Sequence, residues 1–185
     1  MIIRRYFAIL TAVFILCICT FAFISCTEGS TDTSDTGETT PGGESKPVSL
    51  DLSVLREKIA AAADLSNTEE YSTEQIQTFY GIEPDMVKNC IVLRELDVLS
   101  AEVLILAEAV DLKAASDIVE SLKSTNTYKL NELRDYNANP DNERMYYEVE
   151  RAEIITEGVY VFMAIDADDE AINKAIRIYI KEAKG

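Results

Sequence analysis

The most informative absence from this sequence is histidine, which does not occur once in 185 residues. Without an imidazole, the chain has no Ser-His-Asp or Cys-His catalytic group and no histidine ligand for a metal. Tryptophan is absent as well, and glycine and proline are scarce, at seven and four residues. Basic residues number 17 against 33 acidic ones, a net charge of −16, which argues against any surface that follows nucleic-acid phosphates.

The first 25 residues have the layout of a secretory signal peptide. Arg4 and Arg5 are their only charges, and a long apolar run follows and stops just before Cys26. Phe23-Ile24-Ser25-Cys26 resembles the lipobox of bacterial lipoproteins, although Phe23 stands where an aliphatic residue is usual. Cys26 is therefore the predicted lipidation site and mature N-terminus, and the lipid bilayer is the first expected partner.

The alternative for this segment is a signal anchor that is not cleaved. About 18 apolar residues are close to the minimum that spans a bilayer, so length does not separate the two interpretations. Both place Arg4 and Arg5 inside the cell and the rest of the chain outside. The expected location is the outer face of the cell membrane.

Cysteine is too scarce after this leader to form a disulfide bond. Cys17 and Cys19 lie in the leader and Cys26 would carry lipid, which leaves Cys90 as the one thiol of the folded part. A disulfide within the domain is therefore excluded despite the exported setting. We expect Cys90, inside an apolar segment, to behave as a small buried hydrophobic residue.

A polar segment separates the leader from the folded part. Residues 27–47 contain no hydrophobic side chain, so residues 26–47 are predicted to be a flexible acidic linker that carries the lipidated cysteine. A chain of this length has a root-mean-square reach of about 25 Å. Residues 48–185 are then predicted to form a single domain.

Hydrophobic periodicity predicts the elements of this domain. Helices are expected over about 51–64, from a capping box at Ser72 to Gly81, over 111–135, and after a cap at Asp168, with one helical turn near 144–148. Strands are expected at 86–93, 101–107, 152–156 and 159–165. The fold class is α+β, with an antiparallel sheet of about four strands built from two hairpins, helices on one face, and the order αα-ββ-α-ββ-α.

Several segments resemble the domain of unknown function 4358 family of small lipoproteins from clostridial-type bacteria. They are Phe79–Ile82, Ser100–Val103, Tyr136–Pro140, Ala152–Ile155 and Gly158–Phe162, in that order. The similarity extends over about residues 50–183. It implies an envelope lipoprotein and carries no activity, because the family has none assigned.

The acidic run Asp166–Glu170 suggests either a calcium loop or a helix start. Ala171 stands where a calcium loop needs glycine, and Arg177 where it needs a bidentate glutamate. Acids are favoured at a helix N-terminus by capping and by the helix dipole. We therefore expect capping, with Ile172, Ile178 and other apolar residues of this last helix facing the core.

One connection has the composition of a recognition surface. The candidate residues are Tyr136, Asn139, Asn142, Arg144, Tyr146 and Tyr147. Tyrosine and amide side chains on exposed loops are common in binding sites. The alternative is a plain helix stop whose tyrosines pack on the sheet edge, and in either case one of Tyr146 and Tyr147 is expected to be buried.

No catalytic, metal or cofactor site is predicted. The expected domain holds only Gly81, Gly158 and Gly185, too few for a phosphate-binding loop. The favoured function is therefore a non-enzymatic binding domain at the cell envelope, with a small ligand or an envelope protein as partner and no nucleic acid. The alternative is a small cell-wall hydrolase that uses two carboxylates.

Overall fold

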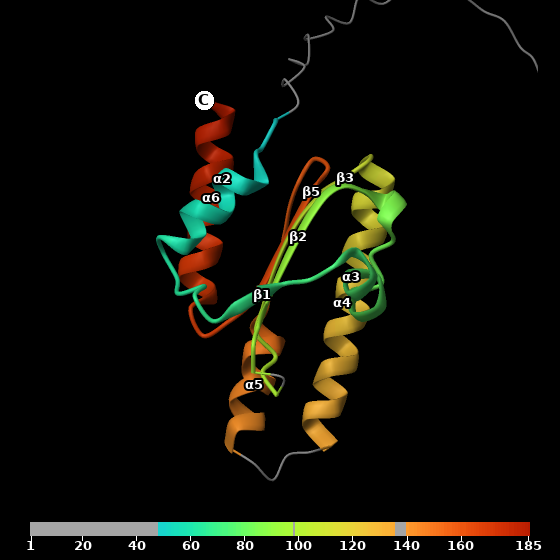
Figure 1. The fold of residues 1–185 in the computed structure, drawn as a ribbon, viewed down its shortest axis with the longest axis vertical. Helices are drawn as coiled ribbons and strands as arrows, with labels where there is room; N and C mark the ends of the chain where they lie inside the picture. Colours follow the sequence, from blue (N-terminus) through green and yellow to red (C-terminus); the bar gives the residue numbers. More distant parts are fainter. Residues whose placement is uncertain (1–47, 98, 136–139) are drawn as a thin grey trace, which may run out of the picture. The chain divides into compact units, whose positions relative to one another are not determined.

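The structure, a computed structural model, describes residues 48–97, 99–135 and 140–185. The predicted signal peptide and linker, with Cys26, lie outside these described residues. Five strands form one antiparallel sheet in the order β1-β2-β3-β5-β4 (Figure 1). None of the helices among the described residues is long and apolar enough to cross a bilayer.

The strands are β1 (Thr68–Glu70), β2 (Val87–Glu95), β3 (Val103–Ala109), β4 (Ile154–Glu157) and β5 (Tyr160–Ile165). The helices are α2 (Leu52–Ala60), α3 (Thr73–Tyr80), α4 (Leu112–Asp135), α5 (Pro140–Arg151) and α6 (Asp169–Lys184), with a short 3-10 helix, η1, at Pro84–Met86. The class is mixed α and β with an antiparallel sheet, as predicted. The two hairpins, β2–β3 and β4–β5, are both present.

Helices cover both faces of the sheet, so the prediction that they lie on one face is wrong. Figure 1 shows α2 and α6 on one side and α3 and α4 on the other. Residues of β3 alternate between two cores: Val103 and Ile105 pack with α3, α4 and α5, while Leu104 packs with α2 and α6. The physical reason is visible in β5, where every residue is buried, as in strands covered on both faces.

The prediction of about four strands also needs correction, because β1 is a fifth. Its sequence is Thr-Glu-Glu, and its last two residues are exposed. It pairs with the end of β2, with Thr68 opposite Glu95 and Glu70 opposite Leu93. A three-residue polar edge strand has no hydrophobic alternation, so periodicity does not detect it.

The predicted helical turn near 144–148 is a full helix, α5 (Pro140–Arg151). Proline suits the first turn of a helix, where its missing N–H has no partner to lose. The buried face of α5 consists of Met145, Glu148 and Val149, spaced three and four residues apart. The observed order is therefore α-β-α-ββ-αα-ββ-α when β1 and α5 are included.

The local signals around α3 and the last hairpin are confirmed. The Ser72 hydroxyl accepts from the Gln75 N–H at 3.4 Å, and the Gln75 side chain accepts from the Ser72 N–H at 2.8 Å, which completes the capping box. Gly81 ends α3 in the left-handed conformation, with φ of 63°. Gly158, with φ of 56°, forms the turn between β4 and β5.

The start and the buried face of α6 differ from the prediction. Asp168 precedes the helix, but its side chain makes no capping hydrogen bond; the Asp166 carboxylate instead accepts from the Asp168 N–H at 2.6 Å. The buried residues of α6 are Ile172, Ile176 and Ile180, and Ala175 and Tyr179 also pack against this core. Ile178, which was expected to face inward, is 47% exposed because it lies about 120° or more around the helix from the three buried isoleucines.

The first described residues form hydrogen bonds with tyrosine side chains more than 100 residues further along the chain. The Leu50 N–H donates to the Tyr160 hydroxyl at 3.0 Å, and the Asp51 N–H donates to the Tyr179 hydroxyl at 3.2 Å. The Asp51 carboxylate also caps α2, accepting from the N–H groups of Ser53 and Val54. The chain therefore joins the domain on the sheet face that α2 and α6 cover.

Candidate functional site

An open cleft of about 820 Å³ lies on the other face of the sheet, where the β2–β3 connection meets α3, α4 and α5. We call it the α3–α4–α5 cleft. Small-molecule sites in proteins usually have volumes of about 300–1,000 Å³. The cleft is therefore large enough for a small organic ligand or for one or two side chains of a partner.

Aromatic side chains form one wall of this cleft. The Tyr71 and Phe79 ring centroids are 5.6 Å apart, and those of Tyr71 and Tyr80 are 6.4 Å apart. Tyr71 and Tyr80 are buried, whereas Phe79 is 55% exposed. Leu99, on the β2–β3 connection, lines the cleft as well and is 79% exposed. Two large apolar side chains are thus held open to solvent at one site.

A lysine from α4 and an arginine from β2 lie beside this aromatic wall. Burial and the charge of Arg94 together lower the pKa of Lys129 to about 8, against the opposing effect of Glu132. The Lys129 Nζ lies 5.6 Å from the centroid of the Tyr80 ring. Among the described residues, Lys129 forms no ion pair. Burial and the neighbouring Tyr71 raise the pKa of the Tyr80 hydroxyl, so Tyr80 stays neutral.

Arg144, at the α5 edge of the cleft, bridges two carboxylates. Its Nη1 lies 3.2 Å from Glu102 Oε1 and 2.8 Å from Glu148 Oε1. The Glu148 side chain is only 3% exposed, and its other oxygen, Oε2, has no hydrogen-bond partner. The hydrogen bond to Glu102 and the charge of Glu148 raise the pKa of Arg144. Arg144 therefore neutralises a buried acid, which is a structural role.

The structure places four of the six predicted recognition residues, all of them on α5. Asn142 and Arg144 line the cleft, whereas Tyr146 and Tyr147 do not. Tyr136 and Asn139 lie outside the described residues.

Neither Tyr146 nor Tyr147 is buried, so the expectation that one of them lies in the core is wrong. Tyr146 is half-buried and Tyr147 is 54% exposed, with their rings in edge contact at 5.8 Å. The Arg134 Nη2 donates to the Tyr146 hydroxyl at 3.5 Å. The cause is the burial of α5 through its neighbours Met145, Glu148 and Val149, which leaves both tyrosines at the side of that face.

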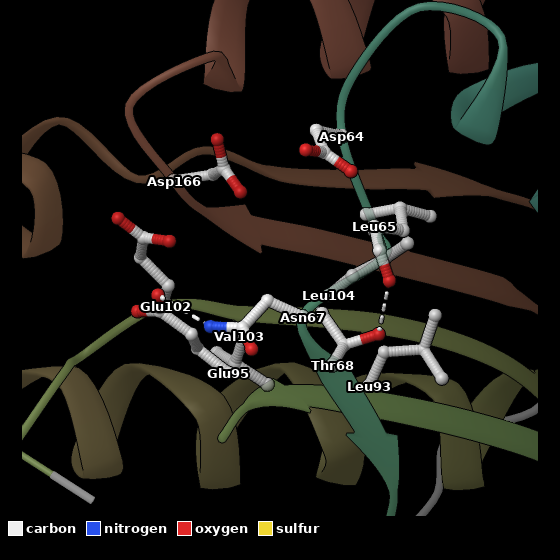
Figure 2. A pocket seen from close by; sticks show the side chains of 10 residues that line it. All are labelled: Asp64, Leu65, Asn67, Thr68, Leu93, Glu95, Glu102, Val103, Leu104 and Asp166. Carbon is white, nitrogen blue, oxygen red and sulfur yellow. Dashed lines mark hydrogen bonds between the residues drawn. The ribbon is translucent and has the colours of Figure 1, made fainter. Parts of the chain in front are cut away.

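A second, much smaller pocket of about 40 Å³ is lined by four acids (Figure 2). Figure 2 shows Glu102 and Asp166 on the same side of it, with Glu95 beside Glu102. The Asn67 amide donates to Glu95 at 3.3 Å, and Asp64 accepts from the Ser66 N–H at 2.9 Å. A pocket of this volume holds one or two water molecules.

Burial raises the pKa of two of these acids. The pKa of Glu102 is raised by desolvation, against the hydrogen bond from Arg144, and by the charges of Asp166, Glu95 and Glu148. Desolvation likewise raises the pKa of Asp166, against the hydrogen bond from the Asp168 N–H. Within the described ranges, no group of three or more cysteine, aspartate or glutamate side chains is arranged to hold a metal ion.

Asp166→Asn is expected to raise the free energy of unfolding at pH 7. An acid whose pKa is higher in the folded state than in the unfolded one costs stability as pH rises through that folded-state pKa. The amide stays neutral and keeps an oxygen that accepts from the Asp168 N–H. Urea titrations at several values between pH 4 and 7 should show a growing advantage of the variant.

The matched control for this test is Asp64→Asn. Hydrogen bonds from Ser66 lower the pKa of Asp64, so its charge favours the folded state and the substitution should reduce stability at pH 7. Equal pH dependence of Asp166→Asn and the native chain would contradict the role assigned to burial of Asp166.

Two other sequence candidates have structural explanations. Cys90 is half-buried in β2, and burial raises its pKa to about 12, so its thiol stays protonated at neutral pH. In the acidic run Asp166–Glu170, Asp169 forms an ion pair with Arg151 at 2.9 Å. The Asp166 carboxylate stabilises the turn before α6 by accepting from the Asp168 N–H.

Sequence reasoning did not find the cleft. Its aromatic, cationic and apolar residues come from α3, β2, α4 and the β2–β3 connection, more than 20 residues apart in several cases. Phe79 lies two residues before the helix stop at Gly81, but nothing in the sequence indicates that its side chain is exposed. Nothing in the sequence around Lys129 distinguishes it from the other lysines of α4.

Comparison with known proteins identifies a family and nothing beyond it. The family model Domain of unknown function (DUF4358) matches residues 61–166, which is more than half of the chain. No curated protein and no solved structure matches the chain. The chain therefore belongs to this family, as the sequence resemblance indicated.

Proposed function

For this member of the DUF4358 family, we propose a lipid-anchored protein of the cell envelope whose domain binds a small ligand or a partner outside the membrane. One observation carries the binding function: the α3–α4–α5 cleft, which is lined by the exposed side chains of Phe79 and Leu99 and by the half-buried Lys129. Exposed apolar side chains gathered at a concave site are typical of binding sites.

The proposed anchor rests on the sequence before residue 48. Cys26 follows the apolar run, and residues 27–47 have no apolar side chain with which to pack. The chain joins the domain beside α2 and α6, while the cleft lies on the opposite face of the sheet. This arrangement keeps the linker's attachment point away from the cleft.

We propose a non-enzymatic function over the alternative, a hydrolase with paired carboxylates. The acids with raised pKa, Glu102 and Asp166, line a pocket of about 40 Å³, too small for a sugar ring. This geometry does not favour glycoside hydrolysis.

Cys26→Ala is expected to abolish lipid attachment and to cause the uncleaved precursor to accumulate. Cells fed an alkyne fatty acid should label the native chain and leave the variant unlabelled. Cys19→Ala is the matched control, since Cys19 lies within the leader and should not alter labelling. Equal labelling of the Cys26→Ala variant and the native chain would refute the proposed anchor.

A further inference from the structure

We infer that the α3–α4–α5 cleft binds a small organic monocarboxylate with an aromatic or aliphatic body. Lys129 and Arg94 would hold its charged end, and Phe79 and Leu99 would contact its apolar body. This inference rests on the binding function proposed above and names the ligand class of that same site.

The charged end follows from the position of two cations on different elements. Lys129 projects from α4 and Arg94 from β2, both are half-buried, and both line the cleft. Burial is the main cause of the lowered pKa of Lys129, and the positive charge of Arg94 lowers it as well, so the two cations lie close enough to repel each other. A carboxylate placed between them interacts favourably with both charges and relieves their repulsion. Lys129 is available for this contact because it forms no ion pair within the described residues.

The apolar end follows from side chains that the fold keeps exposed. Phe79 is 55% exposed, yet its ring packs against that of the buried Tyr71, which limits its movement. Leu99 is 79% exposed on the β2–β3 connection. Covering these two side chains with a ligand's hydrocarbon removes apolar surface from water without first requiring the cleft to open.

Acids in the same cleft restrict the charge of the ligand. Glu95, Asp97, Glu132 and Asp141 line it together with the cations Arg94, Lys129 and Arg144. Glu95 is oriented by Asn67, and Glu132 accepts a hydrogen bond from Tyr128 at 2.8 Å. Carboxylates that outnumber cations repel a polyanion such as a nucleotide or a polyphosphate more strongly than they repel a ligand with a single carboxylate.

Binding should depend on pH through Lys129. The charged groups that act on it are Arg94 on β2 and Glu132 on α4, with the neutral Tyr80 ring of α3 beside it. Lys129 loses its proton near pH 8, whereas Tyr80 stays neutral at higher pH. Affinity for a carboxylate should therefore fall by up to about tenfold per pH unit above pH 8.

The test uses 4-phenylbutyrate as probe and its neutral amide, 4-phenylbutyramide, as the matched control ligand. Isothermal titration of the full chain in detergent micelles, with empty micelles subtracted, should detect binding of the carboxylate below about 10 mM. The amide should bind at least about tenfold more weakly. Lys129→Met should lower carboxylate affinity at least about tenfold and remove its dependence on pH.

The matched control variant is Lys123→Met on the same helix, whose lysine pairs with Glu120 outside the cleft. It should leave affinity unchanged. Thermal melts establish that each variant is folded, and Lys129→Gln replaces Lys129→Met if the latter is not.

Three results would overturn the inference: no carboxylate binding up to about 10 mM, equal binding of the amide, or unchanged affinity in the folded Lys129 variant. Equal binding of the amide would retain the cleft as a binding site and remove only the role of charge. The proposed membrane anchor is decided separately, by the labelling of Cys26→Ala.

Discussion

Phe162→Ala is expected to lower the free energy of unfolding by about 4 kcal/mol. Phe162 lies in the middle of β5, is fully buried, and packs in the core under α2 and α6. Its cross-strand neighbours are Leu106 on β3 and Ile155 on β4, and its ring stacks on that of Tyr160 with centroids 6.3 Å apart. Truncation would leave a cavity bounded by strands on both sides, which cannot close without moving the sheet.

Urea denaturation followed by circular dichroism measures this effect. Phe79→Ala is the matched control, because it removes the same atoms from a side chain that is 55% exposed. Its cost should be below about 1 kcal/mol, as for surface substitutions. If Phe162→Ala and Phe79→Ala cost the same, Phe162 is not in the core described above.

Arg144→Ala is expected to lower the free energy of unfolding by about 2 kcal/mol. The loss comes from Glu148, whose side chain is 3% exposed and whose hydrogen bond at 2.8 Å comes from Arg144. Removing the arginine leaves a buried carboxylate with no counter-charge, and this costs more than the pair itself contributes. The arginine is half exposed, which keeps the effect below that of a fully buried pair.

A double substitution separates this structural role from a recognition role. Glu148→Leu removes the buried acid and places an apolar side chain against Met145 and Val149 on the buried face of α5. In the Glu148→Leu background, Arg144→Ala should cost much less, and denaturant midpoints of the four chains give the coupling. Arg134→Ala, which removes an exposed arginine that contacts Tyr146, is the control and should have little effect. Additive losses in the double variant would contradict the pairing of Arg144 with Glu148.

Much of the fold could be predicted because some residues determine the backbone locally. Ser72 and Gln75 form a capping box wherever a helix follows, and Gly81 and Gly158 occupy positions where a positive φ is required. The apolar runs of β2, β3 and β5 predict strands, and their short connections predict antiparallel pairing. These features depend on neighbours in the sequence, so one sequence is enough to find them.

The features that were missed depend on contacts between distant segments. β1 is polar, and only its pairing with Leu93–Glu95 makes it a strand. The second layer of helices covers β5, which is buried at every position, but the apolar sequence of β5 does not indicate which helices pack on each of its faces. In the cleft, Lys129 is distinguished from Lys123 only by Arg94 and Tyr80, which approach it from other elements.

The hydrogen bonds from Leu50 and Asp51 determine how the domain would bear a mechanical load. A pull on the chain before residue 48 reaches the domain at the two tyrosine hydroxyls, Tyr160 on β5 and Tyr179 on α6, before it reaches any strand end. Because α2 and α6 pack on each other, the force would be shared between an interior strand and the C-terminal helix instead of peeling the edge strand β1 from the sheet. These first points of attachment are thus on β5 and α6, and neither of them is on the three-residue edge strand β1.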